Sequence, residues 1–102
     1  MNTINLQAIA DELEFDLEDV EMLYEVFLAD ATESLKALKS AVANSDYEAI
    51  FTNAHAIKGS AGNILLRDIQ QAAQAMEEPA RAGVDAPYQE LYEKLSTLVA
   101  QE

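Results

Sequence analysis

The chain has 102 residues, half of them hydrophobic, and its 19 acidic residues outnumber the six basic ones to give a net charge of −13. This length predicts a single domain over residues 1–102. The acidic surface argues against binding to nucleic acid or to a membrane, because it repels phosphate backbones and anionic lipids, although solubility alone is the simpler explanation of such a charge. There is no cysteine, no apolar run of membrane-spanning length and no secretory signal, so we expect a cytoplasmic protein without disulfides or thiolate metal sites.

Apolar residues recur at spacings of three and four along nearly the whole chain, which predicts an all-α protein. A short first helix is expected to begin near Thr3 or Asn5. The second follows Asp16, a good N-cap residue, and ends near Asn44. The rows expected to face the core are Leu6, Ile9 and Leu13 in the first helix, and Val20, Leu23, Phe27, Ala31, Leu35, Leu38 and Val42 in the second.

Three further helices are predicted in the second half of the chain. The third is capped by Ser45 or Asp46, the fourth runs from about Leu66 and stops by Gly83, and the fifth begins around Pro87. Their expected core rows are Ile50, Ala54, Ile57 and Ala61 in the third, Ile69, Ala73, Met76 and Ala80 in the fourth, and Leu91, Leu95, Leu98 and Val99 in the fifth.

Four amphipathic helices joined by short turns favour an antiparallel four-helix bundle, with the short N-terminal helix at one end. We expect the bundle to be a monomer.

The stretch AHAIKGSAGN, residues 54–63, contains the only histidine of the chain and two of its three glycines. On a helical wheel, His55, Lys58, Gly59 and Gly62 share a stripe about 120° from the core row of the third helix. We therefore expect the His55 side chain to be exposed on the flank of the bundle, with Lys58 one turn further on.

The two glycines need an explanation, because each costs about 1 kcal/mol relative to alanine inside a helix. Glycine leaves the backbone open to close approach, which suggests that a large partner must reach the imidazole of His55. Two simpler explanations compete: a lone exposed histidine usually has no function, and Gly62 with Asn63 could be a helix stop with Gly62 in the left-handed conformation. The helix stop does not explain Gly59.

Histidine is a nucleophile that can carry a group covalently, and an exposed imidazole near pH 7 is largely neutral. A phosphoryl group on it would bring about two negative charges, which Lys58 could partly offset. Autonomous enzymatic readings are weaker. The chain has no Walker-type nucleotide loop, and it has no second histidine and no cysteine for a zinc site. A Ser-His-Asp triad with Ser60 is also disfavoured, because Ser60 lies on a different side of the helix from His55.

The residues HAIKGSA, 55–61, match the motif H-x-[LI]-K-G-[SA]-[SA] of histidine phosphotransfer (HPt) domains. The segment from Phe27 to Ile64 resembles the two central helices of these domains, and LRDIQQAAQAMEEPARAG resembles the helix that follows. Nearly the whole chain is covered and no kinase or receiver segment is attached, so the sequence looks like a free-standing HPt protein.

This resemblance implies a four-helix bundle in which His55 is phosphorylated and relays phosphoryl groups between receiver-domain aspartates in a multistep two-component phosphorelay. Lys58 would help to hold the phosphoryl group, and Gly59, with Gly62 further along, would keep the approach clear. The partners would be receiver domains of a hybrid sensor histidine kinase, a response regulator or both. The receiver would supply the acidic site and its Mg²⁺, so the chain itself needs no cofactor or metal and has no catalytic activity of its own.

Two departures from the family pattern concern local geometry. Leu65 stands where many members have glycine, and a leucine cannot take a left-handed cap cheaply, so Gly62 or Asn63 is expected to end the helix. Pro79 lies inside the pattern of the fourth helix and should kink it or end it early.

The alternative function is a helical adaptor that binds a signalling partner without phosphorylation. An apolar rim around the histidine stripe would serve either role, and Phe51, Ile64 and Leu65 are the candidates for it. A stand-alone enzyme is the weakest of the three hypotheses.

Overall fold

The structure is a computed structural model that describes residues 5–100, and within this range it contains five helices and no strand. The helices are α1 (Leu6–Leu13), α2 (Leu17–Ala43), α3 (Tyr47–Asn63), α4 (Arg67–Arg81) and α5 (Tyr88–Ala100). Their number and order are those predicted from the sequence. Thr3, one of the two predicted starts of the first helix, lies outside the described residues.

N-cap hydrogen bonds are formed by Asn5, one of the two predicted starts of the first helix, and by Asp46, one of the two predicted caps of the third. The Asn5 side chain accepts from the backbone N–H of Ala8 at 3.0 Å, and that of Asp46 accepts from Ala49 at 3.1 Å. Each bond satisfies a backbone donor that the first turn of a helix leaves free. Asp16 is also in the N-cap position of α2, but its side chain makes no capping hydrogen bond.

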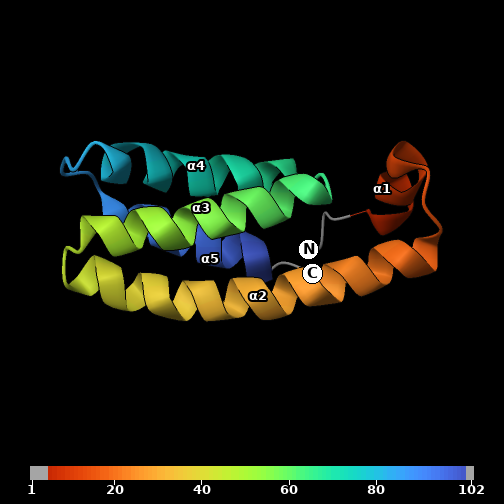
Figure 1. The fold of residues 1–102 in the computed structure, drawn as a ribbon, viewed down its shortest axis with the longest axis horizontal. Helices are drawn as coiled ribbons and strands as arrows, with labels where there is room; N and C mark the ends of the chain where they lie inside the picture. Colours follow the sequence, from red (N-terminus) through yellow and green to blue (C-terminus); the bar gives the residue numbers. More distant parts are fainter. Residues whose placement is uncertain (1–4, 101–102) are drawn as a thin grey trace.

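Helices α2 to α5 lie side by side as a helical bundle (Figure 1). α3 packs against α2 and α4, and α5 closes the bundle by packing against α4 and α2. All the predicted core residues of α3 and α4 are buried, and so are Leu95 and Val99 of α5. The predicted core position of Leu23 is wrong: its side chain is exposed, and the neighbouring Tyr24 is buried in its place.

The first turns of α2 extend beyond the end of α3. α2 has 27 residues and α3 has 17, so at 1.5 Å per residue their lengths are about 40 and about 26 Å. α1 packs on this overhang of α2 (Figure 1). The Arg67 guanidinium, 2.9 Å from the Glu12 carboxylate, links α1 to the start of α4.

Each of the first four helices is followed by one residue in the left-handed conformation: Glu14, Ser45, Leu65 and Gly83. After α3, the N–H of Leu66 donates to the carbonyl of Ala61 at 2.9 Å and that of Leu65 donates to Gly62 at 3.2 Å. This pair of bonds is the Schellman motif, and equivalent pairs follow α1, α2 and α4.

The end of α3 agrees with the sequence in one respect and differs in another. Asn63, one of the two expected last residues, ends the helix, but the left-handed residue is Leu65, with φ 58°, and not Gly62, so the expectation that a leucine avoids this position is wrong. The Schellman bonds and the burial of the next residue, Leu66, offset a backbone cost of about 1–2 kcal/mol. Of the two effects expected of Pro79, the early end is wrong, because α4 continues past it to Arg81, and the kink stays a prediction.

Candidate functional site

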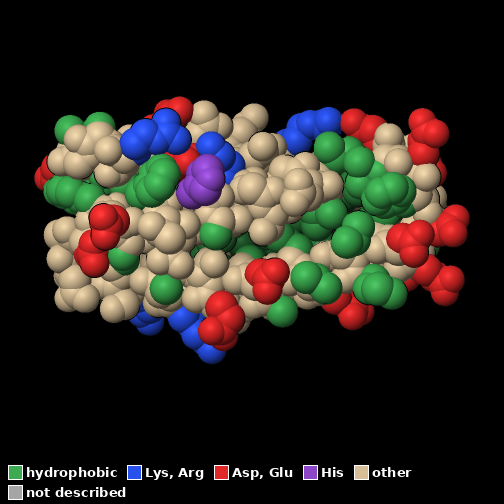
Figure 2. All heavy atoms as spheres, in the orientation of Figure 1, with side chains coloured by type: hydrophobic (Ala, Val, Ile, Leu, Met, Phe, Trp, Pro, Cys, Tyr) green, Lys and Arg blue, Asp and Glu red, His purple; other side chains and the backbone are tan. Residues whose placement is uncertain are grey.

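The imidazole of His55 lies on the outer side of α3, with 58 % of its side chain exposed. The four residues of the α3 core row, Ile50, Ala54, Ile57 and Ala61, are all buried, so the wheel that placed His55 on the flank is confirmed. Figure 2 shows the histidine on the open face of the molecule, with basic side chains beside it. The ring is therefore within reach of a docking protein.

Beneath the ring lies Glu77 of α4, whose side chain is fully buried. Its Oε2 is 2.6 Å from Nδ1 of His55 and 3.0 Å from Nη2 of Arg81, and its Oε1 is 2.6 Å from Nζ of Lys58. One buried carboxylate thus joins the histidine to two cations, one from each of the two helices. A buried charge is tolerated only when it is paired in this way.

These contacts determine the protonation of the carboxylate. Burial by itself would raise the pKa of Glu77, but the contacts with Lys58 and His55 and the charges of these residues outweigh it and hold the pKa below the ordinary 4.5. Glu77 is therefore ionised at neutral pH and can only accept hydrogen bonds.

The ionised carboxylate selects one tautomer of the histidine. Because Glu77 Oε2 can only accept, Nδ1 of His55 must be the donor of the 2.6 Å hydrogen bond. In the neutral ring the remaining lone pair is then on Nε2. The arrangement presents Nε2 as the nucleophilic atom.

Phe51, one turn before His55, stacks against the imidazole ring. The two rings stack with centroids 5.5 Å apart and an angle of 21° between their planes. The Arg81 guanidinium lies 5.5 Å from the centre of the same Phe51 ring, within cation–π range. The half-buried Phe51, predicted as a docking residue, is thus also a structural neighbour of both His55 and Arg81.

The two glycines of the stripe differ in what surrounds them. A Cβ added at Gly59 would meet no atom within 4 Å, so this position is open. A Cβ added at Gly62 would lie 2.9 Å from Nε2 of Gln70. Gly62 therefore faces a side chain of α4, and the expectation that it keeps the approach to His55 clear is wrong.

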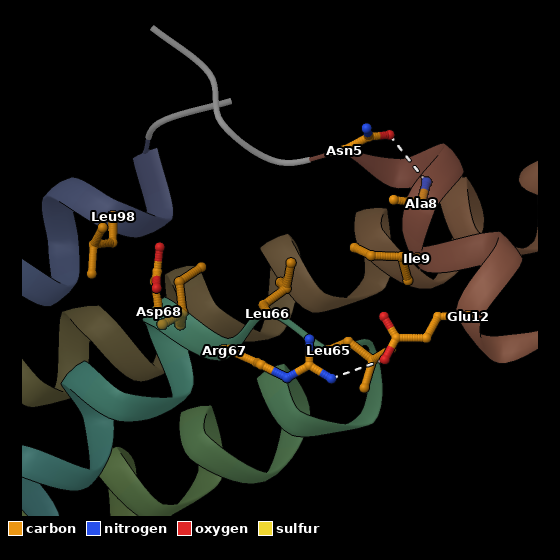
Figure 3. A pocket seen from close by; sticks show the side chains of 10 residues that line it. Asn5, Ala8, Ile9, Glu12, Leu65, Leu66, Arg67, Asp68 and Leu98 are labelled. Carbon is orange, nitrogen blue, oxygen red and sulfur yellow. Dashed lines mark hydrogen bonds and ion pairs between the residues drawn. The ribbon is translucent and has the colours of Figure 1, made fainter.

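The predicted apolar rim is only partly accessible. Ile64 is buried, with 3 % exposure, so its prediction as a docking residue is wrong: as the residue capping α3 it turns into the core. Leu65 is half-buried and lines a cavity of about 280 Å³ between α1 and the turn from α3 to α4 (Figure 3). The Arg67–Glu12 ion pair borders this cavity, and none of His55, Lys58 or Gly59 lines it.

Exposed apolar side chains are found elsewhere, mainly in α2 and the turn before it: Phe15, Leu17, Met22, Leu23 and Val26. We call these five residues the α2 apolar patch. Figure 2 shows hydrophobic side chains gathered over α1 and the start of α2, on the face that carries the histidine. The sequence reading missed this patch, because it assigned Leu23 to the core and gave the other four no role.

Sequence reasoning also missed Glu77 and Arg81. One signal was present: Glu77 follows the predicted core residue Ala73 by four positions and precedes Ala80 by three, which places a carboxylate on the buried stripe of α4. A charge on such a stripe requires a partner. The sequence did not indicate that the partners would be His55 and Lys58.

Within residues 5–100, no helix is both long and apolar enough to cross a membrane. In the same range, no group of three or more His, Cys, Asp or Glu side chains is placed to hold a metal ion.

The family model of the Hpt domain matches residues 22–101. The chain therefore belongs to the Hpt domain family, whose members are phosphocarriers that transfer phosphoryl groups through a histidine in phosphorelays and interact with receiver domains of two-component proteins. Searches of curated proteins and of solved structures gave no significant match.

Proposed function

We propose that this protein accepts a phosphoryl group on Nε2 of His55 from the aspartate of one receiver domain and passes it to the aspartate of another. The observation that carries the proposal is the hydrogen bond between Nδ1 of His55 and the buried Glu77. It fixes the tautomer and leaves Nε2 as the nucleophile on an exposed ring. The chain acts as a carrier, and the positioning groups and Mg²⁺ for phosphoryl transfer come from the receiver.

Two cations are available to the bound phosphoryl group. Lys58 and Arg81 both contact Glu77 in the unphosphorylated protein, and a group with about two negative charges on Nε2 would compete with the carboxylate for them. Lys58, with 26 % of its side chain exposed, is the more enclosed of the two, whereas the Arg81 side chain is 60 % exposed. We assign Lys58 the main role in stabilising the phosphoryl group.

The scaffold proposed for this chemistry is an antiparallel four-helix bundle of α2 to α5 that acts as a monomer. The short connections of residues 44–46 and 64–66 favour antiparallel neighbours. Such a bundle holds α3 and α4 in a fixed register, which the contact between His55 and Glu77 requires.

The surface proposed to dock the receiver combines the open backbone at Gly59 with the α2 apolar patch. Gly59 leaves the helix surface next to His55 free of side-chain bulk. Figure 2 shows hydrophobic side chains over α1 and the start of α2, the region of the patch, on the face that carries the histidine. Contiguous exposed apolar surface of this kind marks sites of interaction with other proteins.

The test is phosphotransfer from phosphorylated receiver domains of the same organism. We expect at least one receiver to label the wild-type protein with an acid-labile, base-stable phosphate, and His55→Gln to abolish labelling while the far-UV circular dichroism stays helical. Lys58→Ala should slow the transfer without unfolding the protein. Labelling that survives His55→Gln would contradict the assignment, and a receiver complex that still signals with His55→Gln would favour the adaptor alternative.

A further inference from the structure

Phosphorylation changes the charge of the His55 ring as well as adding a group to it. In the resting protein the ring is bound through Nδ1–H to Glu77 Oε2 at 2.6 Å, and Nε2 carries the lone pair. When Nε2 forms its bond to phosphorus, the proton on Nδ1 is not part of the reaction. In the product, Nε2 is bonded to phosphorus and Nδ1 keeps its proton, so the ring carries one positive charge. The Glu77 carboxylate lies directly beside this charge.

The fate of that Nδ1 proton decides how reactive the phosphorylated ring is. If the proton stays, attack by a carboxylate or by water on phosphorus breaks the P–Nε2 bond, and its electron pair returns to Nε2 to give neutral imidazole. If the proton is lost first, the same step must expel an imidazolate anion, which is a much poorer leaving group. The protonated ring is therefore the form that donates the phosphoryl group.

We propose, building on the proposed phosphorylation of His55, that Glu77 is a positioning residue that keeps the Nδ1 proton on the phosphorylated ring and so maintains it as a phosphoryl donor at neutral and mildly alkaline pH. An anion at hydrogen-bond distance favours the charged form of its partner. Glu77 is fully buried, so little solvent screens this interaction from the carboxylate side.

The other charges around the ring modulate this effect. Lys58 on α3 and Arg81 on α4 both contact the Glu77 carboxylate, and as cations they oppose a positive charge on the ring. Arg81 opposes it most directly, because it shares atom Oε2 with Nδ1 of His55. On α2, the other helix packed against α3, Asp30 and Glu33 line the groove beside Ala56 and Ser60. Among the described residues 5–100, neither Asp30 nor Glu33 forms an ion pair with His55.

The experiment labels the protein with phosphoramidate, which requires no receiver. The Nε2 lone pair attacks phosphorus, the P–N bond of the reagent breaks, and ammonia leaves with its electron pair. The ³¹P chemical shift of phospho-His55 is then followed from pH 5 to 10, and its midpoint reports the loss of the ring proton. The rate of hydrolysis is measured over the same range.

We expect Glu77→Gln to lower the midpoint by about one pH unit. This value is at the low end of the shifts that an adjacent opposite charge produces, because solvent reaches the partly exposed ring. Above both midpoints, the protonated fraction of the phosphorylated variant is about tenfold smaller, so the variant should hydrolyse up to about tenfold more slowly than the wild type. Arg81→Gln should move the midpoint in the opposite direction, by a smaller amount. Opposite shifts cannot come from a general loss of structure, so Arg81→Gln keeps the proposal testable even if Glu77→Gln folds poorly.

The matched control is Glu78→Gln, the same substitution at the next, exposed position of α4, where the carboxylate contacts Gln74. Its midpoint should equal that of the wild type. An unchanged midpoint in Glu77→Gln, or a lowered one in Arg81→Gln, would overturn the proposal for Glu77 while leaving phosphorylation intact. Failure of phosphoramidate to label wild-type His55, or equal labelling of His55→Gln, would contradict the proposed function itself.

Discussion

Glu77 and His55 are 22 residues apart in the chain, yet Glu77 Oε2 lies 2.6 Å from His55 Nδ1. The contact joins a fully buried carboxylate on α4 to an exposed imidazole on α3, and it is the connection between the core of the bundle and its reactive surface. Its strength depends on the charge of Glu77, which makes it sensitive to pH.

Glu77→Gln should lower the free energy of unfolding by about 2 kcal/mol at pH 7, the scale of hydrogen bonds to a charged group. The pKa of Glu77 is held below its ordinary 4.5 by Lys58 and His55 despite its burial. A depressed carboxyl pKa stabilises the folded state above the unfolded pKa, and this stabilisation is lost as the pH falls through the folded pKa. The difference between wild type and variant should therefore be full above about pH 5 and shrink below pH 4.5.

Urea unfolding at several pH values between 3 and 7 measures this difference. Glu78→Gln, an exposed carboxylate on the same helix, serves as the control and should track the wild type at every pH. A stability difference between wild type and Glu77→Gln that stays constant down to pH 3 would show that the charge of Glu77 is not what stabilises the cluster.

The fold could be predicted because its information is local. Apolar spacing of three and four identified all five helices, and the N-cap side chains of Asn5 and Asp46 marked two of their starts. The errors occurred where tertiary contacts decide: the assignment of Leu23 rather than Tyr24 to the core depended on which side of α2 its neighbours cover. Leu65 was misjudged because its backbone cost was considered without the Schellman bonds that offset it.

The site was predictable only in its α3 half. His55 and Lys58 are three residues apart on one helix, so their neighbourhood follows from helical geometry. Glu77 and Arg81 reach them from α4, and that depends on how two helices pack, which sequence spacing does not determine. The same limit explains Gly62, whose missing side chain accommodates Gln70 of α4.

Ser45→Gly should stabilise the protein by about 0.5–1 kcal/mol. Ser45 is exposed and has φ 52° in the Schellman turn after α2, a conformation in which glycine avoids the penalty of a Cβ. The gain exceeds the added entropy of the unfolded chain. Thermal unfolding followed by circular dichroism measures it.

The neighbouring Asn44 provides the contrast for this prediction. Its φ is −97°, a conformation that suits residues with a side chain. Asn44→Gly should therefore lower the stability. Equal effects of glycine at the two positions would contradict the assignment of strain to Ser45.

The double variant Met22→Gln, Val26→Thr should weaken receiver docking without affecting the chemistry of His55. Both residues belong to the α2 apolar patch, with 64 % and 54 % exposure. Removing their apolar contacts should raise the receiver concentration needed for half-maximal transfer by about tenfold, equivalent to 1.4 kcal/mol. Labelling by phosphoramidate should stay at the wild-type rate.

The control for the patch is Val84→Thr, which polarises another exposed apolar side chain, in the connection between α4 and α5. It should leave the transfer unchanged. A receiver that reacts equally well with the double variant would exclude the α2 apolar patch from the docking surface.

Gly59→Ala separates the needs of folding from those of phosphotransfer. A Cβ at Gly59 meets no atom within 4 Å, so alanine should stabilise α3 by about 1 kcal/mol through its helix propensity. The same methyl group stands one turn from His55 on the surface that a receiver must approach, so transfer from the receiver should slow. Phosphoramidate is small and should label the variant at the wild-type rate.

Gly62→Ala is the comparison. Its Cβ would lie 2.9 Å from the Gln70 side chain, which would have to move, so its gain in stability should be smaller than that of Gly59→Ala. If Gly59→Ala is more stable and equally fast with receivers, the glycine is not needed for docking, and its cost to the helix would require another explanation.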